Sequence, residues 1–540
     1  MYKNTEHITK VLDFGTEGEG ICKIDGFTVF VPSAVKGDTV KILIVKENKH
    51  FGYGKLLEVI EPSPLRTEPL CPVFSKCGGC TMQSVKYAGQ LEYKKDKVLQ
   101  ALRRIGGFED SVITSVTGSD PSYRYRNKAQ FPVAEINGKV TAGFYAPHSH
   151  RVVENPDCPL QDSRTNEVVN AVCDWANDNK ISAYNEETKK GLLRKICIRI
   201  GKDEGVLVLV SAGRVPHTEK LTKSITEKFP HMKGIVINYN SNPTNNIYGD
   251  KDEVVFGVPY IYDSIGDIKY KIHYRSFYQV NPYTTKLLYE KALELASPHK
   301  EKTIFDLYCG GGTISLFLAK KAKRVIGIEI VEDAVTNSKE NAILNGIDNA
   351  EFYCGEAEVI APRMIAGGTK ADIVVVDPPR KGCGEKLLSA MGDMKPERLV
   401  YVSCDAATMA RDAKILCENG YTLSQVHVFD QFPQTSHVET VVLLSKGEVD
   451  SKNIRVEFSL EDMDMSEFQE GATYPQIKAY VLEHTGLKVS NLYISQIKRK
   501  CGLEVGKNYN LPKSEDSRQP QCPPEKEKAI REAFKYFGMT

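Results

Sequence analysis

Apolar and polar residues alternate over residues 1–60, and glycines interrupt the pattern at short intervals. The clearest alternating runs are Phe-Thr-Val-Phe-Val at 27–31 and the segment 38–44. Short strands at such close spacing are typical of small closed β-barrels of the oligonucleotide-binding (OB) type. We therefore predict an OB-type barrel over residues 1–60. A proline-rich linker follows, with Pro62, Pro64 and Pro69.

A different pattern begins beyond residue 300, where short apolar runs alternate with helical stretches. The run 302–307 precedes a glycine-rich turn, a helical stretch follows over 313–321, and the next run, 324–328, ends at Glu329. Alternation of strand, helix and strand is typical of α/β folds with a parallel sheet. We therefore predict a doubly wound α/β sheet. Three later apolar runs belong to it: residues 373–376, 399–402 and 438–444.

The remaining regions complete the expected organisation. Residues 61–270 mix strands and helices without internal repeats, and residues 451–540 contain three helical stretches with Gly486 and Gly502 as stops. A chain of 540 residues is long enough for three or four domains. The expected parts are a barrel (1–60), a central mixed α/β domain (61–270), an α/β domain (271–447) and a small helical appendage (448–540).

The composition is that of an ordinary water-soluble protein, with 41% hydrophobic and 26% charged residues. A net charge of +1 gives no global field that would attract a polyanion, so any nucleic-acid surface must be local. No apolar segment follows Met1, and no run is long enough to span a bilayer, so we expect a cytoplasmic protein without membrane contact. In that compartment the 14 cysteines indicate thiolate or metal chemistry rather than disulfides.

The glycine-rich turn has the features of a cofactor site. Gly310 begins a Gly-Gly-Gly run between a strand and a helix, where backbone N–H groups can approach a ligand closely. Glu329 lies 19 residues later, ends the next strand and would hold ribose hydroxyls. The glycine spacing is not that of a dinucleotide site, no Walker lysine follows, and a later Asp-Pro-Pro-Arg segment favours S-adenosylmethionine over a nicotinamide. A tight turn in an unrelated α/β domain would show the same glycines.

Two strand ends supply candidate reactive groups. Asp377 opens the Asp-Pro-Pro-Arg segment after one apolar run, and Cys404 follows the next. Side chains just past the carboxyl ends of parallel strands line a common crevice, so a carboxylate and a thiol are expected in one cleft. Cys404 could instead be a small core residue, as free cysteines often are. Its polar neighbours Ser403 and Asp405 argue for an accessible thiol.

A thiol in such a cleft could act as a covalent nucleophile on a pyrimidine base. Carbon 5 of the ring is not nucleophilic, but thiolate addition at carbon 6 makes an enolate that can take a methyl group at carbon 5. A general base must then remove the carbon-5 proton, and Glu439 at the start of the last strand is the candidate. Because a free thiol is mostly protonated near neutrality, Cys404 would need local activation. A glutamate at a strand edge, taken alone, would be solvated surface.

These segments together resemble the RNA uracil-5-methyltransferase family, the bacterial ribosomal and transfer-RNA 5-methyluridine enzymes. The resemblance covers residues 1–445 and leaves the last part of the chain uncovered. The motifs that carry it are Phe-Tyr-Gln-Val-Asn-Pro (277–282), Asp-Leu-Tyr-Cys-Gly-Gly-Gly (306–312), Glu329, Asp-Pro-Pro-Arg (377–380), Ser-Cys-Asp (403–405) and His-Val-Glu (437–439).

The resemblance implies a class I methyltransferase with a Rossmann-like sheet. It implies that Cys404 is the nucleophile and Glu439 the base. It also implies which side chains contact the methyl donor or the flipped uracil: Gln279, Tyr308, Glu329 and Asp377.

Three comparisons within related enzymes refine this reading. Family members often have proline after the polar residue that follows the cysteine, whereas this chain has Asp405-Ala406. RNA cytosine-5-methyltransferases carry a second cysteine in the Asp-Pro-Pro-Arg region, and that position holds no cysteine here, which favours uracil. Amino-methyltransferases usually have an aromatic residue after the two prolines, where this chain has Arg380.

A second group of cysteines lies far from these motifs in sequence. Cys71, Cys77 and Cys80 fall close together beside a Gly-Gly pair, and Cys158 could supply a fourth ligand. Four cysteines can bind zinc or an iron–sulfur cluster, and spacing alone does not separate the two. In the family that the chain resembles, the matching pattern holds a four-iron, four-sulfur (4Fe-4S) cluster. The resemblance therefore implies such a cluster here, in a structural or RNA-positioning role, and unligated structural cysteines are the alternative.

Three regions are candidate RNA contacts. Residues 123–128, Tyr-Arg-Tyr-Arg-Asn-Lys, interleave aromatic and cationic side chains as single-stranded RNA sites do, although a half-buried strand would show the same pattern. The N-terminal barrel resembles the TRAM domain, an RNA-binding module often joined to such enzymes. The C-terminal helices carry Lys498-Arg499-Lys500 and Lys507, which fit either an RNA contact or a solvated face.

The sequence thus predicts an S-adenosylmethionine-dependent enzyme, expected to be monomeric, that forms 5-methyluridine in structured RNA. 23S ribosomal RNA is the favoured substrate, and the T-loop uridine of transfer RNA is the nearest alternative. Amino-methylation of a base is a second alternative, which Arg380 and Cys404 disfavour. An RNA-binding iron–sulfur protein without activity is the third, and the presence of Cys404, Asp377 and Glu439 argues against it.

Overall fold

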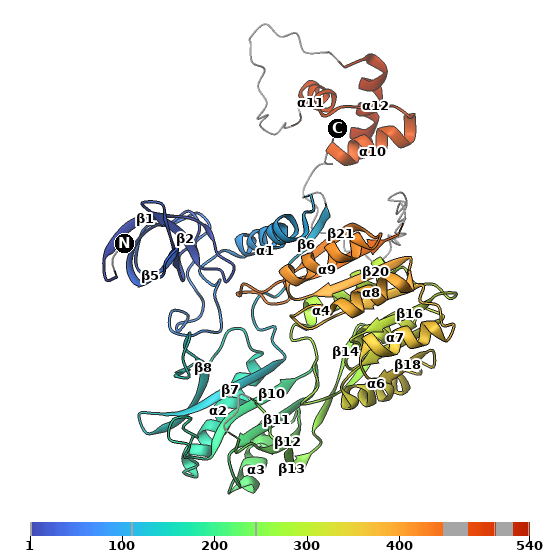
Figure 1. The fold of residues 1–540 in the computed structure, drawn as a ribbon. Coiled ribbons are helices and arrows are strands. Elements are labelled where there is room, and N and C mark those ends of the chain that lie inside the picture. Colours follow the sequence, from blue (N-terminus) through green and yellow to red (C-terminus); the bar gives the residue numbers. More distant parts are fainter. Residues whose placement is uncertain are drawn as a thin grey trace. The chain divides into compact units, whose positions relative to one another are not determined.

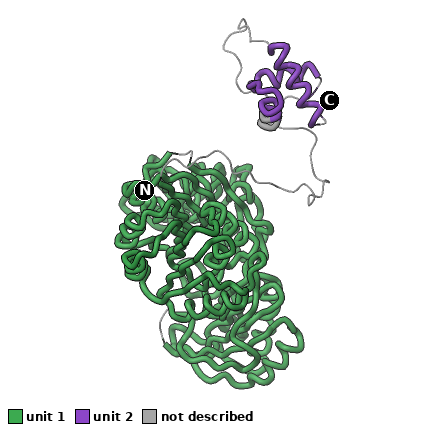
Figure 2. The backbone as a smooth tube through the Cα atoms, turned by 90° about the vertical axis from the view of Figure 1, so that its right-hand side faces the viewer, with its two compact units in different colours: residues 1–450 green, residues 451–540 purple. Residues whose placement is uncertain are grey.

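The computed structural model separates into two compact units, residues 1–450 and residues 451–540 (Figure 2). The first unit contains all the candidate site residues named above. The residues that the structure describes are 3–109, 112–242, 246–446, 474–501, 503, 522–537 and 539.

The N-terminal segment forms a closed barrel with the strand order β1-β2-β3-β5-β4, as the alternating pattern predicts (Figure 1). Buried and half-exposed residues alternate along β3 and β4, so that aliphatic side chains such as Val29, Val40 and Ile42 fill the interior. The strands are β1 (Glu6–Phe14), β2 (Gly20–Ile24), β3 (Phe27–Val31), β4 (Thr39–Glu47) and β5 (Phe51–Glu61).

A seven-stranded sheet in the order β13-β12-β11-β10-β7-β8-β9 follows the barrel and linker. Its neighbours are antiparallel except β11 and β12, and the helices α2 (Ser163–Asp178) and α3 (Thr218–Lys228) contribute to its apolar core. The central segment is therefore mixed α/β, as predicted. The strands are β7 (Lys128–Ile136), β8 (Lys139–Tyr145), β9 (Val152–Glu154), β10 (Leu193–Ile200), β11 (Gly205–Ser211), β12 (Met232–Tyr239) and β13 (Lys251–Gly257).

The predicted α/β sheet has the order β18-β17-β16-β19-β20-β22-β21-β6. The strands from β18 to β20 are parallel, whereas β22 runs antiparallel between β20 and β21. The strands are β6 (Ile113–Thr117), β16 (Thr303–Leu307), β17 (Arg324–Glu329), β18 (Ala350–Cys354), β19 (Ile373–Val376), β20 (Arg398–Ser403), β21 (Thr422–Phe429) and β22 (Glu439–Ser445).

Helices cover both faces of this sheet, which makes it doubly wound. One apolar core contains residues of α4 (Pro282–Ala296), α5 (Thr313–Ala319) and α6 (Glu332–Leu344), together with the hairpin β14 (Tyr260–Ile265) and β15 (Ile268–His273). The opposite core contains residues of three later helices and of α1 (Tyr87–Ala101). These later helices are α7 (Ala357–Ala366), α8 (Glu385–Met394) and α9 (Ala406–Glu418).

One segment within the expected central domain packs on the α/β sheet instead. β6 pairs in parallel with β21 at the edge of the sheet, and α1 contacts both β21 and α9. Lys94 of α1 is fully buried and forms an ion pair with Asp430, which follows β21. The seven-stranded sheet is therefore inserted, in sequence, between β6 and the remaining strands of the sheet that β6 completes.

The described residues of the second unit form three helices, as expected from the sequence. They are α10 (Tyr474–Thr485), α11 (Asn491–Lys500) and α12 (Pro524–Tyr536). Ile477, Ile494 and Phe534 meet in their apolar core. Lys507, a candidate RNA contact in the sequence, lies outside the described residues. Within the described ranges, no helix of either unit is long and apolar enough to cross a membrane.

Candidate functional site

The glycine-rich turn after β16 is shaped for a ligand on one side and for packing on the other. Gly310 and Gly312 have positive φ angles of 54° and 77°. A Cβ on Gly312 would lie 2.8 Å from Ser338, whereas a Cβ on Gly310 or Gly311 would have nothing within 4 Å. Gly312 is therefore required by packing, and the space beside Gly310 and Gly311 is open.

Glu329 closes this turn from the end of β17. One of its carboxylate oxygens accepts a hydrogen bond from the N–H of Gly310 at 3.1 Å, and the other accepts from Val331 N–H at 2.9 Å. Tyr308, in the left-handed region at φ 65°, places its hydroxyl 3.1 Å from Glu358. The predicted cofactor residues Tyr308, Gly310 and Glu329 are thus brought together at one edge of the sheet.

Two neighbouring carboxyls lie at or near strand ends beside this turn: Asp306 is buried, and Asp377 is half-buried. Asp306, in β16, accepts a hydrogen bond from Ser315, while its other carboxyl oxygen has no partner among the described residues. Burial raises the pKa of Asp306 to about 7, against the effect of the Ser315 hydrogen bond and with a contribution from Asp377. Burial also raises the pKa of Asp377, which follows β19, to about 6. The site therefore has carboxyls whose charge is costly until a ligand compensates for it.

Strand register brings the predicted nucleophile and base together. β20 and β22 are antiparallel, and Ser403 pairs with Thr440, so Cys404 just beyond Ser403 lies opposite Glu439. The hydroxyl of Thr440 also donates to the carbonyl oxygen of Ser403 at 3.2 Å. Cys404 is half-buried, and Glu439 is only 4% exposed. The two residues therefore lie next to each other across the strand pair.

The environment raises the pKa of both groups. Burial raises the pKa of the Cys404 thiol to about 11, the carboxylates of Glu439 and Asp377 raise it further, and Arg380 opposes them. Burial, together with Asp377, also raises the pKa of Glu439 well above its usual value, and Arg380 again opposes the shift. Arg380 lowers the pKa of both groups, so it stabilises the charged form of each.

Gln279 is buried beside the segment that leads into Glu439. Its side-chain oxygen accepts a hydrogen bond from Gln431 at 3.3 Å, and its carbonyl oxygen accepts from Asn127 at 2.9 Å. Asn281 caps α4 and donates to Ser119 at 2.9 Å. The Phe-Tyr-Gln-Val-Asn-Pro motif thus connects the seven-stranded sheet to the α/β sheet at the site.

Residues 430–438, called here the 430–438 loop, hold Glu439 in place through contacts that the sequence did not predict. Gln434, at φ 70°, forms a reciprocal pair of hydrogen bonds with Gln90 of α1, at 2.9 Å each. Its carbonyl oxygen accepts from the backbone N–H groups of Thr81 and Met82, at 3.1 and 3.0 Å. The loop is therefore fixed by α1 and by the residues directly after Cys80.

The segment 123–128 supports the same loop and is not an exposed stacking surface. Tyr125 is 1% exposed and donates to the carbonyl oxygen of Pro433 at 3.0 Å. Asn127 is also buried, and its side-chain amide donates to the carbonyl oxygen of Gln279. The RNA-facing interpretation was wrong for these two residues, because the alternation of polar and aromatic side chains arises from contacts at a domain junction.

A large groove opens over Cys404. It has a volume of about 920 Å³ and lies between the barrel, α1 and the α/β domain. Arg380, Cys404 and His437 line it on one side, and Phe14 and Phe30 of the barrel line it on the other. A substrate that reaches Cys404 through this groove would therefore touch the barrel as well.

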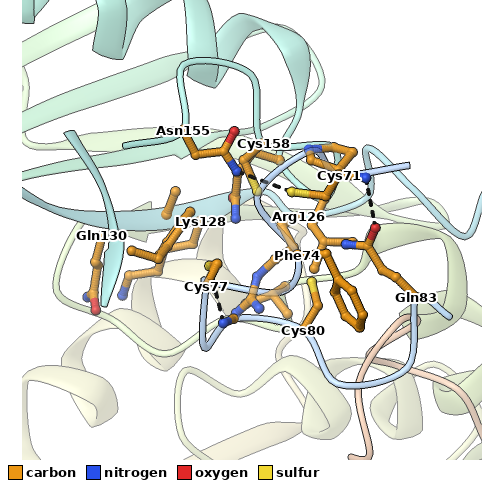
Figure 3. A pocket seen from close by; sticks show the side chains of 17 residues that line it. Cys71, Phe74, Cys77, Cys80, Gln83, Arg126, Lys128, Gln130, Asn155 and Cys158 are labelled. Carbon is orange, nitrogen blue, oxygen red and sulfur yellow. Dashed lines mark hydrogen bonds between the residues drawn. The ribbon is translucent and has the colours of Figure 1, made fainter. Parts of the chain in front are cut away.

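The four cysteines predicted as metal ligands line one separate cavity of about 420 Å³ (Figure 3). Cys71 accepts a hydrogen bond from the side-chain amide of Asn155 at 3.6 Å, and Cys77 accepts from the N–H of Gly79 at 3.4 Å. Cys80 and Cys158 face the same space. Within the described residues, no group of three or more cysteine, histidine or carboxylate side chains converges closely enough to hold a single metal ion.

Some residues at the site were missed by sequence reasoning. Tyr289, inside α4, lies close enough to Asp377 and Glu439 for their charges to raise its pKa, in addition to burial, and its hydroxyl is 2.9 Å from that of Thr313. Gln431 donates to Thr285 at 2.7 Å. The only signal for either was its position near a recognised motif, since each acts through a contact distant in sequence.

Comparisons with known proteins agree with this geometry. A family model described as tRNA (Uracil-5-)-methyltransferase matches residues 248–447, and a TRAM domain model matches residues 8–57. A Halalkalibacterium halodurans protein named as an uncharacterized RNA methyltransferase is 45% identical over 445 residues, which are 82% of this chain and 97% of that protein. A Clostridium tetani protein with the same description is 45% identical over 446 residues, with the same coverage of 82% and 97%.

One solved structure is similar over most of the chain. The crystal structure of Pyrococcus abyssi tRNA (uracil-54, C5)-methyltransferase in complex with S-adenosyl-L-homocysteine matches with a TM-score of 0.67 and 28% identity, over 81% of this chain and 99% of that one. The expected class I methyltransferase fold with an N-terminal TRAM barrel is thereby confirmed. Homology at this level, over the segment that carries Glu329, Cys404 and Glu439, shows that the chain belongs to the RNA (uracil-5-)-methyltransferase family.

Proposed function

We propose that this enzyme forms 5-methyluridine in structured RNA through a covalent bond between Cys404 and carbon 6 of the target uracil. The observation that carries the proposal is the register of β20 and β22, which sets Cys404 opposite Glu439 beside Asp377 and Arg380. The residues proposed as nucleophile, base and charge-stabilising groups thus lie close to one another.

The open side of the glycine turn fits the methyl donor. S-adenosylmethionine, when bound, supplies an electrophilic methyl group. Glu329 would accept hydrogen bonds from its ribose, because this carboxylate ends the second strand beside the turn. Gly310 leaves room for the ligand, and Asp377, Tyr308 and Gln279 are the further side chains proposed to contact the donor or the uracil.

The thiol must lose its proton before it can attack. With a pKa of about 11, Cys404 is protonated near neutrality, so the thiolate has to form as the substrate binds. Arg380 favours the thiolate electrostatically, since it lies close enough to lower the thiol pKa. The thiol proton passes to water, the sulfur adds to carbon 6, and the electron pair of the 5,6 double bond moves to an enolate. Carbon 5 would then take the methyl group from the sulfonium of the donor, which would leave as S-adenosylhomocysteine.

Glu439 is suited to complete the reaction. The methylated ring still carries a proton at carbon 5, and its removal restores the double bond while the carbon–sulfur bond breaks and the Cys404 thiolate leaves. A carboxylate whose pKa is raised by burial is a stronger base than one in water. Glu439 would therefore accept this proton once Arg380 and the bound substrate have favoured its charged form.

Ribosomal RNA, and 23S rRNA in particular, is the proposed substrate. The transfer-RNA T-loop is the second candidate, and the similar Pyrococcus abyssi structure, which is named as a tRNA (uracil-54) enzyme, favours it. In either RNA the uracil must leave its stack to reach Cys404, at a cost of a few kcal/mol. Mapping of 5-methyluridine in ribosomal and transfer RNA from a strain lacking the gene would decide between them.

The four-cysteine cavity supports a 4Fe-4S cluster rather than zinc. A single zinc ion needs four ligands that converge at about 2.3 Å, and the described residues contain no such convergent group. A cluster binds each cysteine through a different iron, so its ligands surround a larger space, as Cys71, Cys77, Cys80 and Cys158 do. N–H donors to the sulfurs of Cys71 and Cys77 would stabilise their thiolate charge. Anaerobically purified protein should be brown and contain iron and sulfide, and colourless zinc-loaded protein would contradict the cluster.

The covalent step can be tested with RNA that carries 5-fluorouridine at the target site. Fluorine cannot leave as a proton does, so the wild-type enzyme should remain bonded to this RNA, and Cys404→Ala should form no adduct. An adduct with the Cys404→Ala protein would refute the nucleophile. Glu439→Gln should transfer the methyl group to ordinary RNA but release product slowly, and normal turnover by this variant would remove Glu439 as the base.

A further inference from the structure

The outer face of the barrel carries a cluster of aromatic side chains that are not part of its apolar core. Phe30 of β3 and Phe51 and Tyr53 of β5 form a triad with ring centroids 5.7 to 6.0 Å apart. Tyr53 is 38% exposed, and Phe30 and Phe51 are half-exposed. None of the three belongs to the apolar core of the barrel.

Glycines, and not large side chains, occupy the inward-facing positions of this part of β5. Gly52 and Gly54 alternate with Phe51 and Tyr53 on β5, and the two glycine positions are the buried ones that face the barrel interior. A Cβ on Gly54 would lie 3.2 Å from Ile42 and two valines, so the interior has no room for a side chain there. The large side chains of this strand segment therefore face outward, where they gain little from burial.

Lysines accompany the aromatic triad. Lys46 of β4 is paired in register with Tyr53, and Lys55 follows Tyr53 by two residues on the same strand. Both positions therefore face the same side of the sheet as Tyr53. Both lysines are exposed. Aromatic rings interleaved with cations are the combination that binds single-stranded nucleic acid, through base stacking and phosphate contacts.

The triad is continuous with the groove over Cys404. Phe30 belongs both to the triad and to the wall of the groove, whose other side includes Arg380 and Cys404. The barrel is also held at a defined position. Tyr93 of α1 donates to the carbonyl oxygen of Thr16 at 2.7 Å, and Lys97 donates to Thr16 at 2.8 Å and to Ser436 of the 430–438 loop at 2.9 Å.

We propose that Phe30, Phe51 and Tyr53 stack against unpaired bases that flank the target uridine, while Lys46 and Lys55 contact the adjoining phosphates. The proposal rests on the proposed function, because it takes the target uridine to enter the groove at Cys404. The occupant is a single-stranded stretch of the substrate RNA. The triad would therefore select sites in which the nucleotides beside the uridine are free to unstack.

The first test measures RNA affinity. Stacking of one base changes affinity by roughly tenfold or more, so Tyr53→Ala should raise KM about tenfold for RNA with single-stranded flanks and leave kcat unchanged. The same variant should behave as wild type on RNA trimmed to the target loop. Ile8→Ala is the matched control, since Ile8 is 67% exposed on β1, away from β3 and β5 in the closed barrel. An equal loss on both RNAs would overturn the proposal.

The second test detects stacking directly. The chain has one tryptophan, Trp175, so a Tyr53→Trp variant adds one new fluorophore at the triad. Binding of flanked RNA should quench its emission, whereas Ile8→Trp should show no quenching beyond that of the wild type. Equal signals from the two variants would refute the aromatic contact, and so would a quench that does not require flanks.

These outcomes are separate from those that test the covalent mechanism. At saturating RNA, Tyr53→Ala should still form the adduct with 5-fluorouridine RNA. If the wild type forms no adduct but Tyr53→Trp is quenched by flanked RNA, the covalent proposal fails and the RNA contact stands. If adducts form and the quench is absent, the aromatic proposal alone fails.

Discussion

The molecule places cysteines in two sites, and the surroundings of the sulfur atoms differ between them. Cys404 lies at the end of a parallel strand, opens into a groove and has the carboxyls of Glu439 and Asp377 as neighbours. In the four-cysteine cavity, Cys71 and Cys77 instead accept hydrogen bonds from N–H groups. Carboxylates disfavour a resting thiolate and N–H donors favour one. Burial raises the pKa of Cys77, Cys80 and Cys404 alike, so the two sites differ in the groups beside the sulfur atoms: N–H donors at the proposed ligand set, and carboxyls at the proposed nucleophile.

The two sites are nevertheless joined through one segment. The 430–438 loop ends at Glu439, and Gln434 within it is held by the backbone of Thr81 and Met82, directly after Cys80. A change in structure at the cysteine cavity could therefore displace Glu439, the proposed base, without any contact with the substrate.

Serine substitutions at single cysteines should change methylation and iron content independently of each other. Cys404→Ser should lower methylation by on the order of a thousandfold or more, because the alkoxide needed for attack is inaccessible near neutrality, and leave the brown colour intact. Cys158→Ser should lose iron and colour. Methylation rates and iron content measured on both variants would check this. A colourless Cys404→Ser protein would contradict the separation of the sites.

Adduct formation should accelerate with pH. Because the Cys404 pKa is raised to about 11, the thiolate fraction lies on its rising limb throughout pH 7 to 9 and should increase about tenfold per unit. Single-turnover trapping by 5-fluorouridine RNA would measure it. Arg380→Gln removes a charge that lowers this pKa, so its rate should be lower at each pH with the same slope. A rate that levels off below pH 8 would show that the thiol is already ionised.

The contact between α1 and the 430–438 loop should have a smaller effect. Gln90→Ala breaks both hydrogen bonds to Gln434 and leaves buried groups unpaired, which should cost about 1–3 kcal/mol of stability. We expect kcat to fall roughly tenfold with KM unchanged, because Glu439 loses its position while the RNA surface is intact. Lys95→Ala, at an exposed position of the same helix, is the control. A loss of stability with normal kcat would show that Gln90 supports only the fold.

The sequence predicted those parts of the molecule whose residues act near their own motif. Strand ends carry Asp377 and Cys404, and a glycine turn with an acidic residue after the next strand is a local pattern, so their meeting follows from the geometry of a parallel sheet. The barrel likewise followed from alternation within a short segment, because all five of its strands lie between residues 6 and 61.

Contacts between segments that are distant in sequence could not be predicted from the sequence. Gln90 and Gln434 are 344 positions apart, and neither lies in a recognisable pattern. Tyr125 looked like a solvent-facing aromatic because its neighbours are charged, but a domain junction buries it. β6 has the composition of any edge strand, so nothing in residues 113–117 indicated which of two sheets it would join. Such pairings depend on tertiary packing, which local patterns do not encode.

The position of β6 also determines how the catalytic domain can be assembled. β6 and α1 are synthesised before the seven-stranded sheet. Their partners, β21 for β6 and Asp430 for Lys94 of α1, are synthesised only after it, so these contacts form late. Pairings of such high sequence separation are slow to form. A fragment that begins at residue 271 would expose the edge of β21 and leave Asp430 without Lys94, although it contains every residue proposed for the chemistry except the cysteines of the cavity.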